Sequence, residues 1–351
     1  MSFVSHHVER RTRKNIFLRQ IDQIINWQPI EKEINKVYKR GHSVDGRPSY
    51  PGLLLFKMLL LQTWYRLSDP GVEDMVNDNL SAMRFCGLQI EDDVPDHSVL
   101  SRFRTELTVK KAFDRLLRKF NKQLEERGIM VKEGAALVDA SITNTPRRPK
   151  GKTKYEIAED RKEDLQSHES KKEEGKQLTL VKQKQPGVDD QGRWLKKGGK
   201  LHYGFKKHIA TDLEGLVTAV HTTTANEHDS KGLKPLLKKT PRSKVKKGTY
   251  ADKGYKVPDN DQLLEELKIK NRLQHKAYRN KPLTEWEIRF NKLISKDRYK
   301  VERTFGGMKR WFGAGIAKYV GLDKAHTQHV MEAIAYNLYR SPGMVMSNTQ
   351  K

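Results

Sequence analysis

The first third of the chain has the hydrophobic periodicity of α-helices. Between residues 15 and 128, apolar positions recur every three or four residues in several stretches, which turn-forming residues separate. Residues 51–67 begin with a proline, which is favourable at a helix start, and residues 72–85 carry their apolar side chains on one face. Residues 109–128 repeat this pattern and end in a glycine that can terminate a helix. We therefore predict a compact all-α domain over residues 1–130.

The rest of the chain has the pattern of strands that alternate with helices. Residues 135–141 form a short apolar run, and the runs 201–212 and 215–225 predict a β-hairpin that turns at Asp212–Gly215. A further strand, a helix and a second strand are predicted at residues 245–255, 259–270 and 271–278. This alternation indicates a mixed α/β domain, which we place at residues 131–345.

A charged segment at residues 146–200 interrupts the second domain. It contains sixteen Lys or Arg and ten Asp or Glu residues, and it has few large apolar residues. Such a segment cannot bury enough apolar surface to fold alone, so we interpret it as a basic insertion that is flexible or ordered by a ligand. A helical excursion with many salt bridges is the alternative. Both interpretations leave the segment outside the core.

The overall charge narrows the choice of partner. The chain has 69 Lys and Arg against 44 Asp and Glu, a formal net charge of +25. A strongly positive protein attracts polyanions, so nucleic acid is the expected partner. The most apolar run, residues 53–61, is too short to cross a membrane. The single cysteine, Cys86, excludes an intramolecular disulfide and a cysteine-based zinc site, and we expect a cytoplasmic protein.

Two aspartates follow apolar strand patterns. Asp139 follows Leu137 and Val138 at the end of the first predicted strand, and Asp252 follows Tyr250 and Ala251 and precedes Gly254, a residue suited to a sharp turn. If these two strands are parallel neighbours, both aspartates lie at the edge of the sheet where α/β proteins bind ligands. A divalent metal would relieve the repulsion between the carboxylates, and Mg²⁺ prefers such oxygen ligands.

A third acid lies in a predicted helix near residues 298–312. Its apolar residues form a stripe that can pack on the sheet, while Arg298, Glu302 and Lys309 share a neighbouring face. One helix can therefore present a metal-binding carboxylate between two cations. Simpler interpretations remain for each acid: Asp139 and Asp252 can stabilise turns, and Arg298 and Glu302 can form a surface ion pair.

At these residues the chain resembles bacterial insertion-sequence transposases of the DDE class, specifically the insertion-sequence-five group. The motifs VDAS, YADKGY and RYKVERTFGGMK resemble the three catalytic blocks of that group, and residues 45–74 and 95–104 resemble its helical region. The spacing Arg298, three residues, Glu302, six residues, Lys309 matches the group's signature, although Ser295 replaces its tyrosine.

The resemblance implies an RNase H-like catalytic domain and a DNA transposase. Asp139, Asp252 and Glu302 would be the catalytic acids and would hold two Mg²⁺ ions, for which Mn²⁺ can substitute. The enzyme would bind the terminal inverted repeats of its element, cleave DNA strands and join the 3′-hydroxyl ends to target DNA. We expect a homodimer on double-stranded DNA and an association with the bacterial nucleoid.

Several further residues are candidates for DNA contact. Basic runs such as residues 231–247 and 268–281, which contain no acid, fit a polyanion. His228 is as consistent with a structural hydrogen bond as with a DNA contact, and core packing is the better interpretation for Trp286 and Trp311. The candidate DNA contacts are Arg298, Lys309, Arg147, Arg148, His228, Arg102, Arg104 and Lys253.

Two other functions fit the same features. A transposase-derived protein without catalytic activity could act as a repressor or an architectural factor on DNA. A host nuclease with an RNase H-like fold would cleave DNA but would not join the ends. The presence of all three acids argues against the first alternative, and joining of the DNA ends distinguishes a transposase from the second.

Overall fold

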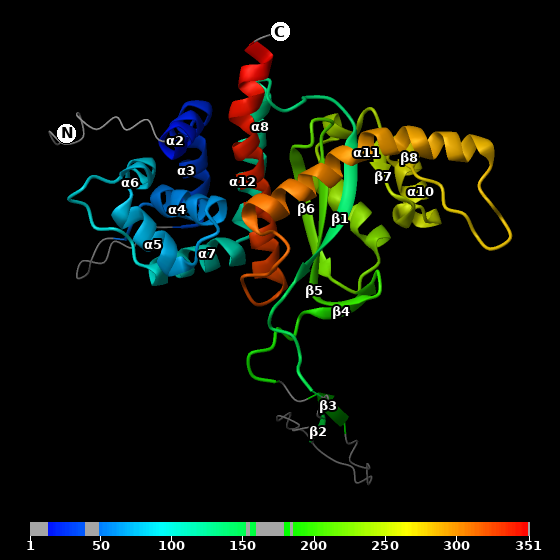
Figure 1. Cartoon of the computed structure of the whole chain (residues 1–351), viewed down its shortest axis with the longest axis horizontal. Coiled ribbons are helices and arrows are strands. Elements are labelled where there is room, and N and C mark those ends of the chain that lie inside the picture. The colour runs from blue at the N-terminus through cyan, green and yellow to red at the C-terminus, as the bar shows by residue number, and fades with distance from the viewer. Residues whose placement is uncertain (1–12, 39–48, 152–154, 159–178, 183–184, 350–351) are drawn as a thin grey trace, which may run out of the picture.

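The computed structural model describes residues 13–38, 49–151, 155–158, 179–182 and 185–349. Figure 1 shows a group of helices on one side, a β-sheet on the other, and the C-terminal helix α12 (Leu322–Thr349) between them. The N-terminal helices are α2 (Arg13–Ile24), α3 (Gln28–Asn35), α4 (Gly52–Trp64), α5 (Asp69–Asp78), α6 (Leu80–Cys86), α7 (His97–Val109) and α8 (Ala112–Glu126). The helical character predicted for this part of the chain is confirmed.

Capping side chains determine where several of these helices begin. The single helix predicted over residues 72–85 is two helices, because the Asn79 side chain accepts hydrogen bonds from two backbone N–H groups at the start of α6. Asp96 likewise accepts from two N–H groups in the first turn of α7. Asp96 is therefore the N-cap of α7.

The main sheet contains parallel and antiparallel pairs. Its strands are β1 (Ala136–Asn144), β4 (Arg193–Lys197), β5 (Lys200–Thr211), β6 (Val217–Thr224), β7 (Thr249–Ala251) and β8 (Asn271–Leu273). The strand order is β4-β5-β1-β7-β8, and β6 also pairs with β5. The β1-β7 and β7-β8 pairs are parallel, whereas β5 runs antiparallel to its neighbours. The predicted hairpin is confirmed as β5 and β6.

Helices cover both faces of this sheet. On one face, α11 (Glu285–Phe312) and α12 contact β1, β5 and β6. On the other, α9 (Leu233–Lys239) packs against β5 and β6 and contacts α10 (Pro258–Glu266). Short 3₁₀ turns lie at η1 (Asp229–Gly232), η2 (Arg242–Val245) and η3 (Lys253–Tyr255). The side chains of β1 alternate between the two layers: Leu137 belongs to the core under α11, and Ala136 and Val138 belong to the opposite core.

Helix α12 joins the helical segment to the sheet. The Trp64 indole donates to the Ala335 carbonyl at 3.0 Å, and the Asn337 side chain donates to Asn121 at 2.9 Å and to the Val217 carbonyl at 2.8 Å. One hydrophobic core runs through α2–α8, β1, β5, β6, α11 and α12. The change of secondary structure near residue 130 is therefore not a break in the core.

The end of the predicted insertion belongs to the sheet, which corrects our expectation that all of residues 146–200 lie outside the core. Asp189 is fully buried, and its carboxylate accepts from the Gly321 N–H at 3.0 Å. Arg193–Lys197 forms the edge strand β4. The strand was not predicted because its side chains are mostly charged and exposed, as is common on edge strands, and show no apolar alternation. Two other strands, β2 (Tyr155–Ala158) and β3 (Thr179–Lys182), form a separate antiparallel pair.

We predicted that the insertion is either flexible or helical. Most of the residues that this prediction concerns lie outside the part of the chain that the structure describes. In the described part of the chain, no helix is both long enough and apolar enough to cross a membrane.

Candidate active site

The two predicted aspartates lie level with each other on neighbouring parallel strands. Leu137 of β1 is in register with Tyr250 of β7, and Asp139 and Asp252 each follow two residues later. Leu137 and Tyr250 both belong to the core under α11. Because side chains alternate along a strand, the two aspartates continue on that same face. The predicted side-by-side arrangement of the strands is confirmed.

Asp139 is a largely buried carboxylate with little compensation for its charge. Its Oδ1 accepts from the N–H of Ala140 at 2.8 Å, and its Oδ2 lies 3.6 Å from Nη2 of Arg298. Burial raises the pKa of Asp139 to about 6, against the opposing effect of Arg298, and the charges of Asp252 and Glu302 raise it further. The site therefore favours the approach of an additional cation to this carboxylate.

Asp252 occupies the turn that follows β7. It caps η3, and its Oδ1 accepts from the Gly254 N–H at 2.9 Å. A Cβ atom at Gly254 would lie 3.0 Å from that same oxygen, so the glycine allows the carboxylate its close approach to the backbone. Lys253, beside it, is exposed. The buried hydroxyl of Tyr255 lies 3.5 Å from Nδ1 of His208, and burial together with the charge of Asp139 raises the pKa of Tyr255.

Arg298 of α11 links two of the three acids. Its Nη2 lies 3.6 Å from Asp139 and 3.5 Å from Oε1 of Glu302, and its Nη1 donates to Oε1 of Gln274 at 3.1 Å. The Gln274 amide in turn donates to Oγ of Ser295 at 2.8 Å. Buried Nε of Arg298 finds no hydrogen-bond partner among the described residues. The guanidinium of Arg298 thus lies between two acids, and its buried Nε–H donates no hydrogen bond to any described residue.

Glu302 and Lys309 lie on the outer side of α11. The Glu302 side chain is 59% exposed, so it can move without disturbing the core. Lys309 is also exposed; partial burial and the charges of Lys207 and Lys197 lower its pKa. Gly306 lies between them in sequence, and a Cβ atom there would meet nothing within 4 Å. The helix therefore leaves an open surface between an acid and a base.

The three acids approach one another without forming a ready metal site. In the part of the chain that the structure describes, no group of three or more His, Cys, Asp or Glu side chains is close enough to hold a metal ion. Asp139 and Asp252 are brought together by the sheet, and Asp139 and Glu302 by Arg298. The carboxylates fit a hard divalent ion by their chemistry, and the exposed Glu302 is the one with freedom to complete such a site.

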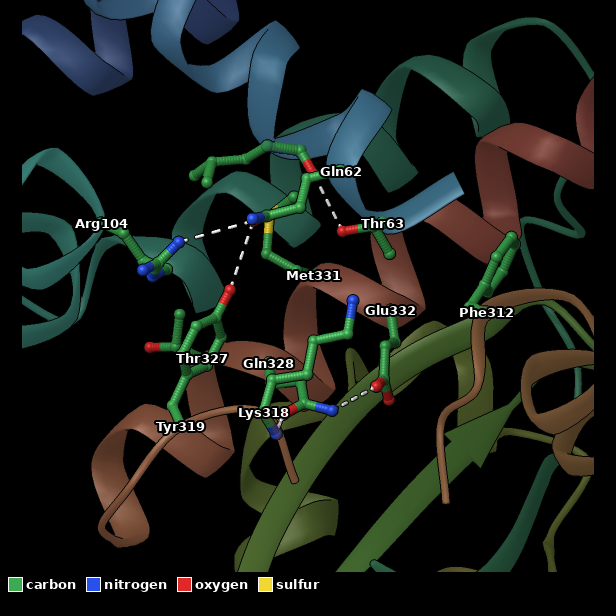
Figure 2. Close-up of a pocket in the computed structure, with 11 residues that line it drawn as sticks. Gln62, Thr63, Arg104, Phe312, Lys318, Tyr319, Thr327, Gln328, Met331 and Glu332 are labelled. Atoms are coloured by element: carbon green, nitrogen blue, oxygen red, sulfur yellow. Dashed lines mark hydrogen bonds between the residues drawn. The ribbon is translucent and has the colours of Figure 1, made fainter. Parts of the chain in front are cut away.

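A separate cavity lies where α4, α7 and α12 meet the loop after α11 (Figure 2). Its volume of about 20 Å³ is enough for one water molecule. Gln62 lies at its centre, and its Oε1 accepts from the Tyr319 hydroxyl at 3.3 Å and from Nη1 of Arg104 at 3.4 Å. None of the three acids lines this cavity, which lies at a joint between helices.

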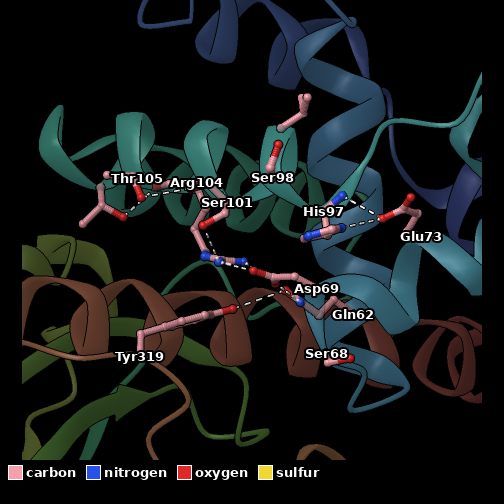
Figure 3. A network of polar contacts seen from close by, with 12 residues as sticks. Gln62, Ser68, Asp69, Glu73, His97, Ser98, Ser101, Arg104, Thr105 and Tyr319 are labelled. Carbon is pink, nitrogen blue, oxygen red and sulfur yellow. Dashed lines mark hydrogen bonds and ion pairs between the residues drawn. The ribbon is translucent and has the colours of Figure 1, made fainter. Parts of the chain in front are cut away.

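Arg104 is buried in this joint, and its predicted contact with DNA stays a prediction. Figure 3 shows its guanidinium pointing at Asp69, to which it donates two hydrogen bonds of 2.8 and 2.7 Å. It also lies 4.1 Å from the centre of the Tyr319 ring. Burial alone would raise the pKa of Asp69, but the hydrogen bonds from Arg104 and Gln62 hold it below its usual value. The side chain is thus already committed to an internal ion pair.

The other candidate DNA contacts stay predictions. Arg102, Arg147 and Arg148 are exposed. His228 is exposed as well, and its Nδ1 accepts from the Ser230 N–H at 3.3 Å, so it caps η1 in the structural way that we considered.

Sequence reasoning missed some neighbours of the site. Gln274 was within a predicted strand, and its place just after β8 at the same sheet edge was the signal that could have identified it. Ser295, which replaces the tyrosine of the signature, holds Gln274. The prediction of core packing was wrong for Trp286, which is 63% exposed. Trp311 does pack against the core, stacked on Tyr336 at 5.9 Å.

Comparison with known proteins identifies the class of protein that this fold and site define. Residues 6–106 match the family model described as "Transposase domain (DUF772)", and residues 132–338 match the "Transposase DDE domain". The second match covers more than half of the chain, so the protein belongs to the DDE transposase family. Enzymes of this class cut DNA, and the predicted RNase H-like fold class is confirmed.

A curated relative gives a more specific comparison. The chain is 38% identical over 241 residues to the transposase for insertion sequence element IS1106 from Neisseria meningitidis serogroup B. The aligned region covers 68% of this chain and 76% of the relative. No solved structure matches the chain. The predicted relationship to insertion-sequence transposases is confirmed, and the narrower insertion-sequence-five group stays a prediction.

Proposed function

We propose that this protein cleaves DNA strands at the ends of its insertion sequence and joins the 3′-hydroxyl ends to target DNA, with Asp139, Asp252 and Glu302 as the catalytic acids. The observation that carries the proposal is the parallel register of β1 and β7, which brings Asp139 level with Asp252 beneath α11. Arg298 then connects Asp139 with Glu302. Two strands and one helix, distant in sequence, thereby contribute to one site.

The three carboxylates are the groups that would hold divalent metal ions. When bound, two Mg²⁺ ions, or Mn²⁺ in their place, would activate a water molecule or a 3′-hydroxyl of the DNA and stabilise the leaving oxygen. The raised pKa of Asp139 supports this proposal, because burial beside other acids disfavours its charge until a cation approaches. Arg298 supplies part of that positive charge and keeps the Asp139 carboxylate oriented.

The basic residues of α11 would hold the DNA backbone at this site. Lys309 is exposed on the helix, and the open surface at Gly306 leaves room for a phosphate between Lys309 and Glu302. Lys253 is exposed directly beside Asp252. Charge-assisted hydrogen bonds from such groups to phosphate oxygens are strong, so they position the scissile bond without reading its sequence.

Isosteric replacement of each acid tests the assignment. Asp139→Asn, Asp252→Asn and Glu302→Gln should each lower the rate of strand cleavage in Mg²⁺ by about a thousandfold or more, because each removes a charged ligand. Affinity for element-end DNA should change little. Glu126→Gln is the matched control, since Glu126 is an exposed acid at the end of α8, away from α11. Full cleavage by any of the three variants would exclude that residue.

The same assay separates the alternative functions. Purified protein is incubated with element-end DNA, target DNA and Mg²⁺, and the products are examined for new 3′-hydroxyl ends and for joined strands. An inactive DNA-binding descendant would produce neither, and a nuclease would produce ends without joining.

We also propose that the protein acts as a homodimer, because two element ends must be joined together at one target. Light scattering of the protein with element-end DNA should show a complex with two chains. A single chain at every ratio of protein to DNA would contradict this proposal.

A further inference from the structure

Residues 275–293 form a projection beside the candidate active site, which we call the distal arm. It comprises the chain that leaves β8, a tight turn, and the start of α11, and Figure 1 shows it reaching beyond the end of the sheet. The N–H of His275 donates to Oδ1 of Asn291 at 2.8 Å, and Nδ2 of Asn291 donates back to the His275 carbonyl at 3.0 Å. The backbones of Tyr278 and Lys281 exchange two hydrogen bonds that close the turn. These hydrogen bonds give the arm a defined conformation.

An exposed aromatic stack lies on this arm. The Trp286 indole stacks on Phe290, with ring centres 5.1 Å apart and planes at 19°. The His275 ring packs edge-on against both, at 5.6 and 5.3 Å. With Phe290 on one side, 63% of the Trp286 side chain is still open to solvent. The stack fixes the indole in place but covers little of it.

The charge around the stack indicates what kind of partner it fits. Residues 268–281 contain six Lys or Arg and no acid. The two acids at the start of α11 are engaged within the arm: Glu287 in a capping box with Thr284 and an ion pair with His275, and Glu285 with Arg289. Within residues 275–293, five Lys or Arg stand against two Glu, so exposed flat rings among excess cations suit a partner that combines phosphates with planar bases. The same charge makes an apolar protein surface an unfavourable partner for the arm.

The arm is continuous with the acid site. Gln274, the residue just before it, accepts a hydrogen bond from Arg298 and donates one to Ser295. From Trp286 to Glu302 the helix advances 16 residues, which is about 24 Å at about 1.5 Å per residue. For a strand that stays stacked between the acid site and the arm, at about 3.4 Å per nucleotide, this distance corresponds to roughly seven nucleotides.

We propose that the distal arm binds a DNA strand roughly seven nucleotides from the reacting phosphate, with an unstacked base against Trp286 and phosphates on Lys276, Arg279 and Lys281. This inference rests on the proposed function of the acid site, since it takes the reacting phosphate as its origin. The bound strand must be single-stranded or locally unpaired, because a base in an intact duplex is stacked on both faces.

A binding assay without divalent metal tests the contact independently of catalysis. The probe is element-end duplex DNA whose flanking strand continues as a single-stranded tail of about four, eight or twelve nucleotides, attached through its 5′ or its 3′ end. A second probe is the joined product, in which the element end is linked to a target strand. Affinities of the full-length protein for these probes show whether flanking or target DNA supplies the base.

Three variants distinguish stacking from packing and charge. Trp286→Leu should weaken binding roughly tenfold for the longer tails of one polarity, or for the joined product, and leave the shortest tail unaffected. Trp286→Phe, which keeps an aromatic face, should bind nearly as wild type. Val109→Ala is the control, because Val109 is an exposed apolar residue at the end of α7, outside the arm. Inorganic polyphosphate, which has charge but no bases, should bind wild type and Trp286→Leu equally.

Two outcomes would overturn the inference. Equal affinity of wild type and Trp286→Leu for every tail and for the joined product would remove the base contact, even if cleavage proceeds as proposed. Equal weakening of polyphosphate binding would reduce the arm to a charged surface. Loss of cleavage in the acid variants bears only on the proposed function, so the two failures are distinguishable.

Discussion

Replacement of Arg104 by methionine tests whether this residue serves the fold and not DNA. The change keeps most of the side-chain volume but removes the guanidinium that donates two hydrogen bonds to Asp69 and packs over Tyr319. The Arg104 and Asp69 side chains are 8% and 23% exposed. Breaking a buried ion pair on one side costs about 3–5 kcal/mol, and the partial exposure of Asp69 places the expected loss near the lower value, about 3 kcal/mol.

Urea-induced unfolding of the full chain measures this loss. Arg102→Met is the matched control, because Arg102 is exposed on the same helix, and it should change the unfolding free energy by less than about 0.5 kcal/mol. The double variant Arg104→Met with Asp69→Leu should recover much of the stability, since no unpaired carboxylate remains.

The same pair predicts a pH dependence. The pKa of Asp69 is lowered in the folded protein, so the pair stabilises the fold above the ordinary pKa of aspartate and this stabilisation is lost as the pH falls through the lowered value. The difference between wild type and Arg104→Met should therefore be largest near neutral pH and shrink in acid. An Arg104→Met protein of unchanged stability that binds DNA weakly would refute this reasoning and support the predicted DNA contact.

Three further predictions concern α11 and its neighbours. A Cβ atom at Gly306 would meet nothing within 4 Å, so Gly306→Ala should raise the unfolding free energy by about 1 kcal/mol. A Cβ atom at Gly307 would lie 3.0 Å from two aromatic rings, so Gly307→Val should lower the unfolding free energy, and urea-induced unfolding measures both changes. Lys207→Met leaves Glu332 buried without its cation and should cost about 3–5 kcal/mol in urea unfolding, largely recovered by adding Glu332→Leu. Gln274→Ala removes a hydrogen bond that orients Arg298, so single-turnover cleavage should slow by about tenfold while DNA affinity stays constant.

The sequence was most informative where a signal is local. The helical periodicity, the turn at Asp212–Gly215 and the position of Asp252 after β7 were predicted, because each depends on residues within a few positions of one another. Asp139 was predicted at the end of its strand, but β1 continues to Asn144 because β5 pairs with it over that whole length. Arg104 could not be interpreted in this way. It lies on a polar helix like the exposed Arg102, and its burial depends on Asp69 and Tyr319, which are distant in the chain.

The same limit applies to Trp286 and to β4. Trp286 has the sequence context of a core residue, and its exposure follows from the extension of α11 beyond the sheet. The strand β4 is charged, and it is a strand because β5 offers it a free edge. In each case the outcome depends on which surfaces meet, and hydrophobic periodicity carries no information about that.

By itself, the sequence determined the succession of helices and strands, the basic character of the protein and the identity of three candidate acids, because these follow from residue type and spacing. The tertiary structure alone decided that Asp139 and Asp252 are level on adjacent strands, that Arg298 and Gln274 support them, and that α12 unites the helical segment with the sheet. Strand register and helix packing arise from contacts between distant parts of the chain, so they exist only once the chain has folded.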